Sequence, residues 1–164
     1  MSSAGASSEA PPAGFDWAAF VSTTDAIAPA FVERTSRMGE WIDSSILFSD
    51  GLCFCAMCEL LQVDYVIEAG TGFGGSTEMF ARYFADGGRV RHIWSVDRAA
   101  TPWEQLLARL RLSESARYVW SSRRRARAVA AARLRTFPQV TLIQGDAFGE
   151  VPPMVTRMTR EPAR

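Results

Sequence analysis

The middle and end of the chain alternate short runs of β-branched and aromatic residues with longer stretches of helical spacing. Residues 63–68, 90–97 and 139–146 each predict a buried strand, and each run closes on a carboxylate. Between them, residues 76–84 and 102–136 place apolar side chains at helical intervals, the second stretch as two segments. Because strands and helices alternate, the pattern predicts an α/β domain with a Rossmann-like, doubly wound parallel sheet and right-handed crossovers.

The residues before the first strand have a different character. Apolar positions between Phe15 and Arg37 predict one or two short helices interrupted at Pro29, and a further helix is expected from about Asp50 to Leu61. The first residues are nearly all small or proline, too poor in bulky side chains to order themselves. The expected organisation is a disordered tail at 1–14, an N-terminal helical region at 15–62, an incomplete Rossmann-like core at 63–155 and a polar tail at 156–164.

Composition narrows the class of protein. The 164 residues are 48% hydrophobic and 22% charged, which is typical of a single globular domain. The longest mainly apolar stretch, residues 46–61, is broken by Ser49, Asp50 and Glu59, so no membrane-spanning helix is expected. The N-terminus lacks the pattern of a secretory signal, and three cysteines are too few for a disulfide framework, so we expect a cytoplasmic protein.

The basic residues are all arginine and lie unevenly. Up to Asp97 there are 13 acidic residues and 5 arginines, net −8, whereas the remainder has 13 arginines and 5 acidic residues, net +8. The missing lysine excludes Schiff-base chemistry and a P-loop lysine. The run Arg123–Arg125 lies in an Arg/Ala-rich helical stretch, and a chain of zero net charge lacks the basic footprint of nucleic-acid-binding proteins. Nucleic acid is therefore not an expected partner.

A glycine-rich loop, residues 68–76, follows the first predicted strand. Glycines let the backbone turn tightly and approach a ligand, and the next helix presents its free N–H groups there. In open parallel sheets, ligands bind beyond the carboxyl ends of the strands. The spacing Gly70-x-Gly72-x-x-Gly75, with Asp97 22 residues later, fits an NAD-binding fingerprint. The spacing Gly70-x-Gly72-x-Gly74, preceded by Glu68, fits an S-adenosylmethionine loop equally well.

Two acidic residues favour S-adenosylmethionine over NAD. A carboxylate at Glu68 repels a pyrophosphate but suits the cationic ammonium and sulfonium groups of S-adenosylmethionine. Asp146, at the end of the third predicted strand, is placed to accept a hydrogen bond from an adenine amino group. This arrangement suits one nucleoside joined to an amino acid better than two nucleotides.

The segment Val66–Thr77 resembles motif I of class I S-adenosylmethionine-dependent methyltransferases, in the branch of antibiotic-tailoring O-methyltransferases and cephalosporin-hydroxylase-like proteins. Trp94–Asp97 is similar to the end of that family's second strand, whose carboxylate holds the ribose hydroxyls, and Val140–Ala147 to its third-strand motif at adenine. The resemblance covers roughly residues 60–155 and implies O-methyl transfer to a small molecule. The cofactor-binding residues expected are Glu68, Gly70, Thr71, Gly72, Phe73, Gly74, Gly75, Ser76, Asp97, Asp146 and Ala147.

The resemblance ends after the third strand. Residues 148–155 look like the connection to the family's fourth strand, and the later strands have no counterpart, so we expect only the N-terminal, cofactor-binding half of the fold. No catalytic residue is assigned, and binding is expected rather than turnover. The alternatives are an NAD-binding Rossmann domain, or an inactive truncated remnant acting as a binding module, with homo-oligomers forming through an exposed sheet edge.

The cysteines and the single histidine are weaker candidates for chemistry. Cys53, Cys55 and Cys58 provide three thiolates, one short of a tetrahedral zinc site that only His92 could complete. They lie among apolar residues, as small core side chains do. No metal site is expected, and His92 is expected to be structural rather than a general base.

Overall fold

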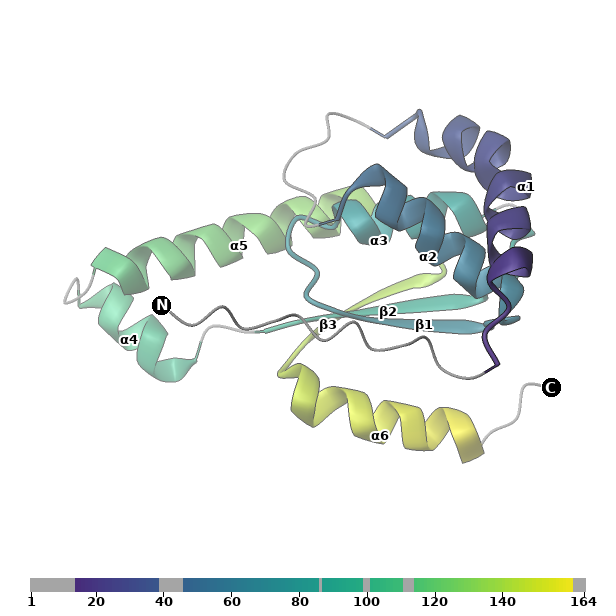
Figure 1. The fold of residues 1–164 in the computed structure, drawn as a ribbon. Helices are drawn as coiled ribbons and strands as arrows, with labels where there is room; N and C mark the ends of the chain where they lie inside the picture. The colour runs from purple at the N-terminus through teal and green to yellow at the C-terminus, as the bar shows by residue number, and fades with distance from the viewer. Residues whose placement is uncertain (1–13, 39–45, 86, 99–100, 111–113, 161–164) are drawn as a thin grey trace, which may run out of the picture.

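Three parallel strands form the centre of the computed structural model, which describes residues 14–38, 46–85, 87–98, 101–110 and 114–160. The strands are β1 (Tyr65–Ala69), β2 (His92–Asp97) and β3 (Val140–Gln144), hydrogen-bonded in the order β1-β2-β3. Tyr65 pairs with His92, and Ile93 pairs with Val140. The expected α/β class with a Rossmann-like parallel sheet is confirmed (Figure 1).

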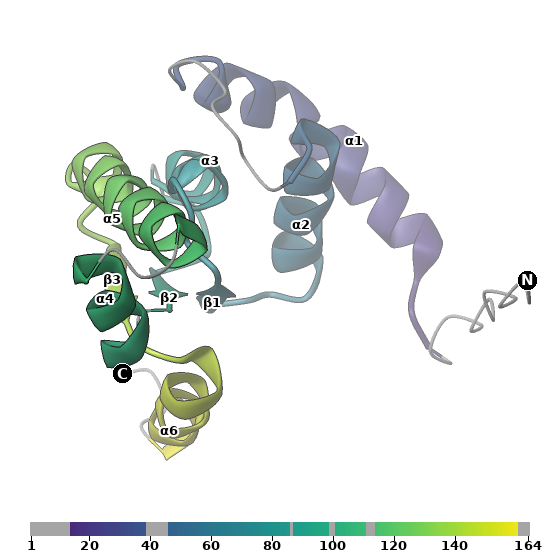
Figure 2. The same cartoon turned by 90° about the vertical axis from the view of Figure 1, so that its left-hand side faces the viewer.

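Helices cover the two faces of the sheet unequally. Figures 1 and 2 show α3 and α5 over one side of the strands, with α2 and α1 stacked beyond β1, whereas α6 lies across the other face. Both connections between strands run over the first face, and the chain changes face after β3. The helices are α1 (Trp17–Thr35), α2 (Phe48–Leu60), α3 (Gly75–Phe84), α4 (Pro102–Arg109), α5 (Glu114–Leu134) and α6 (Ala147–Arg160).

The apolar core lies between the helices and the first face of the sheet. Phe31 of α1, Cys55 of α2 and Met79 of α3 are fully buried and meet Val66 and Ile93 of the strands. A Cβ on Gly51 would lie 1.9 Å from the sulfur of Met79, so glycine there lets α2 and α3 approach closely. The core therefore joins the N-terminal helices to the sheet.

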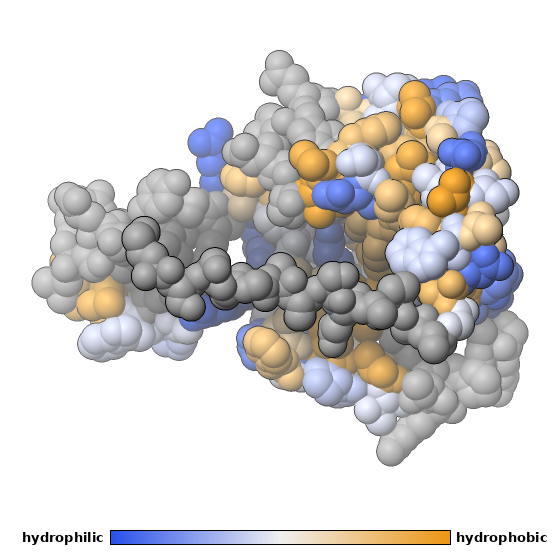
Figure 3. All heavy atoms as spheres, viewed as in Figure 1, coloured by the Kyte–Doolittle hydropathy of each residue, from blue (hydrophilic) through white to orange (hydrophobic). Residues whose placement is uncertain are grey.

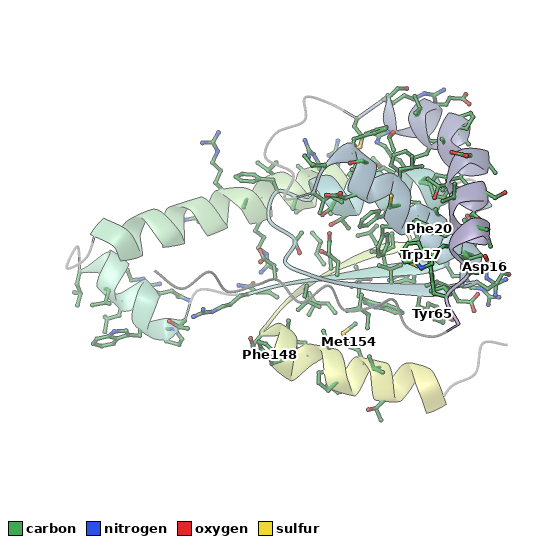
Figure 4. All side chains as sticks on the ribbon, in the orientation of Figure 1. Asp16, Trp17, Phe20, Tyr65, Phe148 and Met154 are labelled. Carbon is green, nitrogen blue, oxygen red and sulfur yellow. The ribbon has the colours of Figure 1, made fainter. Side chains whose placement is uncertain are left out.

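The start of α1 is fixed by a cap and by aromatic packing. The carboxylate of Asp16 accepts a hydrogen bond from the N–H of Ala19 at 2.9 Å, which satisfies a free donor of the first turn. The rings of Phe15 and Trp17 lie 4.7 Å apart, and Phe20 lies 6.0 Å from Trp17. Figure 4 labels Asp16, Trp17 and Phe20 at this end of α1.

Helix α1 runs without a break through Pro29, so the interruption expected there is wrong. A proline removes one backbone donor, but packing on both sides of it holds the helix: Phe31 is in the core and Ile27 packs against it. The second helix, the strands and the two segments between residues 102 and 136 lie close to their predicted positions. Helix α6 extends to Arg160, and residues 1–13 and 161–164 of the expected tails lie outside the described residues.

Some apolar side chains remain on the surface. Figure 3 shows apolar residues exposed over α1 and α2, where Val21 is 56% and Leu61 58% exposed. No helix in the described ranges combines the length and the apolar character needed to cross a bilayer. In the described sheet, β1 and β3 are the edge strands, and association of copies through such an edge stays a prediction.

A buried carboxylate joins α3 to α5. Glu78 is 3% exposed, and its oxygens lie 2.7 Å from Arg82 Nη2 and 3.0 Å from Arg133 Nε. We expect Glu78→Ala to lower the free energy of unfolding by about 3 kcal/mol, because it leaves two partly buried guanidinium groups without their buried carboxylate. Chemical denaturation measures this difference.

Asp64→Ala is the matched control for the Glu78 variant. Asp64 is half-buried and pairs loosely with Arg89 at 3.7 Å and Arg91 at 3.6 Å. Ion pairs of this kind contribute about 1 kcal/mol or less. Equal losses in the two variants would contradict the assignment of Glu78 as the link between α3 and α5.

Candidate functional site

The glycine loop joins β1 to α3 and has one closed and one open side. Gly74 has φ +77°, and a Cβ there would lie 3.2 Å from the Cα of Ala130 on α5. Gly70 and Gly72 also have positive φ, but no described atom lies within 4 Å of the place a Cβ would take at either. The loop therefore packs closely on α5 through Gly74 and leaves free space beside Gly70 and Gly72, where a ligand can approach the backbone.

Three hydroxyl groups surround the carboxylate of Glu68 beneath this loop. Ser76 and Thr77, from the first turn of α3, each donate a hydrogen bond to it, and Ser95 of β2 donates a third at 2.5 Å. Because the single hydroxyl hydrogen of Ser95 goes to Glu68, Thr71 is the donor in its 2.7 Å contact with Ser95. We call these four residues around Glu68 the hydroxyl cluster.

The hydroxyl cluster is buried, and that burial defines the local role of Glu68. Thr77 and Ser95 are fully buried, and Thr71 and Ser76 are 6% and 5% exposed. Glu68 itself is partly buried, and its carboxylate receives three hydrogen bonds from these buried hydroxyl groups. Glu68 thus ties the glycine loop and the start of α3 to β2.

Asp97 and Asp146 lie at the same edge of the sheet as the glycine loop. The N–H of Gly70 donates to the carbonyl of Val96 at 2.7 Å, and that of Gly145 donates to the carbonyl of Asp97 at 3.0 Å. These bonds bring the loop, the end of β2 and the end of β3 side by side. We call this end of the sheet the carboxyl edge.

The two aspartate carboxylates differ from that of Glu68. Asp97 is half-buried and Asp146 is exposed, and within the described part of the chain neither carboxylate makes a hydrogen bond or ion pair. Asp146 directly precedes α6, and its carbonyl accepts from the N–H groups of Gly149 and Glu150. Both carboxylates are therefore available to a ligand at the carboxyl edge.

All the predicted cofactor-binding residues lie at or next to the carboxyl edge. Phe73 is half-buried in the loop, Gly75 and Ser76 begin α3, and Ala147 begins α6. The structure brings these positions together, and their contact with a cofactor stays a prediction.

Sequence reasoning missed three residues of this region. Ser95 pairs directly with Glu68 across the sheet, and Thr77 follows Ser76 on α3. A serine in an otherwise apolar buried strand was the available signal for Ser95. Phe148, at the start of α6, is 91% exposed two positions after Asp146, and nothing in the sequence pattern marked it (Figure 4).

His92 lies at the other end of β2, on the face that α6 covers. Its Nε2 is 2.8 Å from the hydroxyl of Thr141, and its ring lies 4.5 Å from that of Trp94. Asp97 is five residues further along the strand, about 16 Å away at the usual rise per residue. His92 therefore takes no part in the carboxyl edge.

The three cysteines all lie in α2 as free thiols. Cys53 is exposed, whereas Cys55 and Cys58 are buried in the core. Burial raises the pKa of Cys58 to about 11 and raises the pKa of Cys55 further, so both stay protonated at neutral pH. Among the described residues, no group of three or more His, Cys, Asp or Glu side chains is placed to hold a metal ion.

The chain is similar to a solved structure but not to any family model or curated protein. No protein-family model matches the chain, and no curated protein matches it. Among solved structures, the crystal structure of cofactor-bound Rv0187 from MTB is similar to it at 19% sequence identity, with a TM-score of 0.41. The similarity covers 87% of this chain and 50% of that chain, so the present chain spans about half the length of that protein.

Alanine substitutions at Gly74 and at Gly72 are expected to lower the free energy of unfolding by different amounts. We expect Gly74→Ala to lower the free energy of unfolding by about 2–3 kcal/mol, because it adds a clash with α5 to the strain of a positive φ. Gly72→Ala has the strain without the clash and loses about 1 kcal/mol. Thermal or chemical denaturation measures both, and a greater loss in Gly72→Ala would contradict the close packing at Gly74.

Burial lowers the pKa of His92 below its usual value of 6.5. The folded protein then binds this proton more weakly than the unfolded chain, so stability is highest above about pH 6.5 and falls as the pH drops toward the native pKa. We expect His92→Gln to remove this part of the pH dependence of unfolding. Because the chain has one histidine, its NMR titration gives the pKa directly. A native midpoint at or above 6.5 would contradict the assignment.

Proposed function

We propose that the carboxyl edge binds S-adenosylmethionine and that the domain is methyltransferase-like. The observation that carries the proposal is the joint position of the glycine loop, Asp97 and Asp146 at adjacent ends of three parallel strands. In sheets of this type, ligands bind outside the carboxyl ends of the strands. The free space beside Gly70 and Gly72 gives a ligand access to the loop backbone.

Each part of the carboxyl edge takes one part of the cofactor in this proposal. Asp97, at the end of the central strand, accepts hydrogen bonds from the ribose hydroxyls. Asp146 accepts from the adenine amino group, and the exposed ring of Phe148 offers an apolar face to the base. The methionine portion lies over the glycine loop, close to Gly70 and Gly72.

Glu68 acts through the loop rather than by direct contact. Its carboxylate is occupied by three hydroxyl donors, so its first effect is to hold the loop conformation. Its negative charge also lies beneath the loop, where it favours a cationic ligand over a pyrophosphate. We therefore assign Glu68 as a positioning residue.

The chemistry proposed is methyl transfer to an oxygen of a small molecule. When bound, S-adenosylmethionine supplies an electrophilic methyl group. The residues of the carboxyl edge would bind and orient the cofactor, and catalysis of this kind depends largely on alignment of the two reactants. None of the described residues is assigned as a catalytic acid or base.

An NAD-binding Rossmann domain is the second candidate, because the spacing of Gly70, Gly72 and Gly75 and the position of Asp97 also suit a dinucleotide. The charges at the carboxyl edge distinguish the two. Glu68, Asp97 and Asp146 place three carboxylates there, which oppose an anionic pyrophosphate and suit a sulfonium and an ammonium group.

Calorimetric titration separates these candidates. We expect S-adenosylmethionine and S-adenosylhomocysteine to bind the full chain, and NAD not to bind. Asp97→Asn should weaken S-adenosylhomocysteine binding at least about tenfold, because a charged acceptor of the ribose hydroxyls is lost. Asp64→Asn, which alters a carboxylate at the opposite end of the sheet, should leave the affinity unchanged.

Each other outcome of the titration has a defined meaning. Binding of NAD alone would contradict the proposal and support the second candidate, an NAD-binding Rossmann domain. Binding of neither cofactor by a folded chain would overturn both and leave a domain with a non-catalytic role. Equal weakening by Asp97→Asn and Asp64→Asn would show that binding is not located at the carboxyl edge.

A further inference from the structure

A second concave site lies at the opposite end of α3 from the glycine loop. It is a cavity of about 340 Å³ formed by the last turns of α1 and α3 and by the turn before β3. Ten residues of helix separate the two ends of α3, about 15 Å, so this cavity is distinct from the carboxyl edge. We call it the arginine pocket; it is lined by Glu33, Arg34, Arg37, Arg82, Ala85 and Phe137.

Two of the three guanidinium groups are held in place by the protein. Arg34 donates a hydrogen bond to the carbonyl of Tyr83 and lies 5.6 Å from the centre of that ring. Arg82 is fixed by Glu78 at 2.7 Å and lies 5.5 Å from the centre of the Phe137 ring. Each guanidinium has five N–H donors, and these contacts use only part of them. The two cations are therefore oriented before any ligand arrives.

The positive charge of Arg37, unlike those of Arg34 and Arg82, is not accounted for by an interaction within the described part of the fold. The negative ends of α1 and α3 favour one cation each, which accounts for Arg34 and Arg82 in their last turns. Arg37 lies beyond α1, is exposed, and makes no hydrogen bond or ion pair within the described residues, Glu33 included. Three guanidinium groups and one carboxylate give the lining a net charge of +2.

We propose that the arginine pocket binds the phosphate group of a small hydroxylated phosphate monoester. Guanidinium groups from three positions match a dianion with three terminal oxygens, whereas a carboxylate is satisfied by one guanidinium fork. The volume lies near the lower limit of small-molecule sites, about 300 Å³, which is more than a phosphate group alone fills. Glu33 repels phosphate but accepts a hydrogen bond from a hydroxyl of the same molecule.

Calorimetric titration of the full chain at low ionic strength tests this proposal, with glycerol 3-phosphate, inorganic phosphate and glycerol as probes. Glycerol 3-phosphate should bind saturably, inorganic phosphate more weakly, and glycerol not at all. Arg37→Ala should weaken glycerol 3-phosphate binding about tenfold, through loss of a charge-assisted contact. Glu33→Gln should tighten inorganic phosphate binding and reduce the preference for the glycerol ester.

The matched control is Arg127→Ala, which removes the same charge from an exposed position on α5 that does not line the arginine pocket. This variant should bind glycerol 3-phosphate as the unaltered chain does. Equal weakening in both arginine variants would mean general charge attraction and would overturn the proposal, as would the absence of saturable binding. Asp97→Asn should leave phosphate binding unchanged; its loss in that variant would locate the ligand at the carboxyl edge and overturn the assignment.

Discussion

A carboxylate that is partly withdrawn from water has to be matched by hydrogen-bond donors, and the way Glu68 meets this requirement shapes the whole carboxyl edge. Its three donors come from two different elements, Ser95 on β2 and Ser76 and Thr77 on α3. Satisfying one charge therefore fixes the end of β1, the neighbouring strand and the first turn of a helix relative to one another. The glycine loop lies between these fixed points, which limits the conformations that it can take.

Helix α3 makes further polar contacts of this kind along its whole length. Its first turn supplies hydroxyls to Glu68, its middle supplies Glu78 to the arginines of α3 and α5, and its last turn supplies Arg82 to the arginine pocket. Polar residues thus serve different partners along the whole length of the helix, while Met79 and Phe80 fill the core. A single ten-residue element joins the two candidate binding sites to the packing of the molecule.

The sequence was sufficient for features that depend on local pattern. The β-branched runs, the helical spacing and the glycine cluster predict the parallel sheet, and carboxylates at three strand ends predict that Asp97 and Asp146 lie at the same edge of it. Features set by distant partners were not predictable. The role of Glu68 depends on the register that places Ser95 opposite it, and the continuity of α1 at Pro29 depends on its packing. The arginine pocket needs residues 33–37, 82–85 and 137 to converge, which no local pattern encodes.

The contact between Gly74 and α5 has a consequence for how this chain can vary. The Cα of Ala130 lies 3.2 Å from the position of a Cβ on Gly74, and Ala130 is itself fully buried. A bulkier side chain at residue 130 would press on the loop backbone from below, and a bulkier one at residue 74 would press on the helix. Residues 74 and 130, 56 positions apart in sequence, are therefore expected to vary together in evolution. A substitution that enlarges either side chain requires a different conformation of the turn that joins β1 to α3.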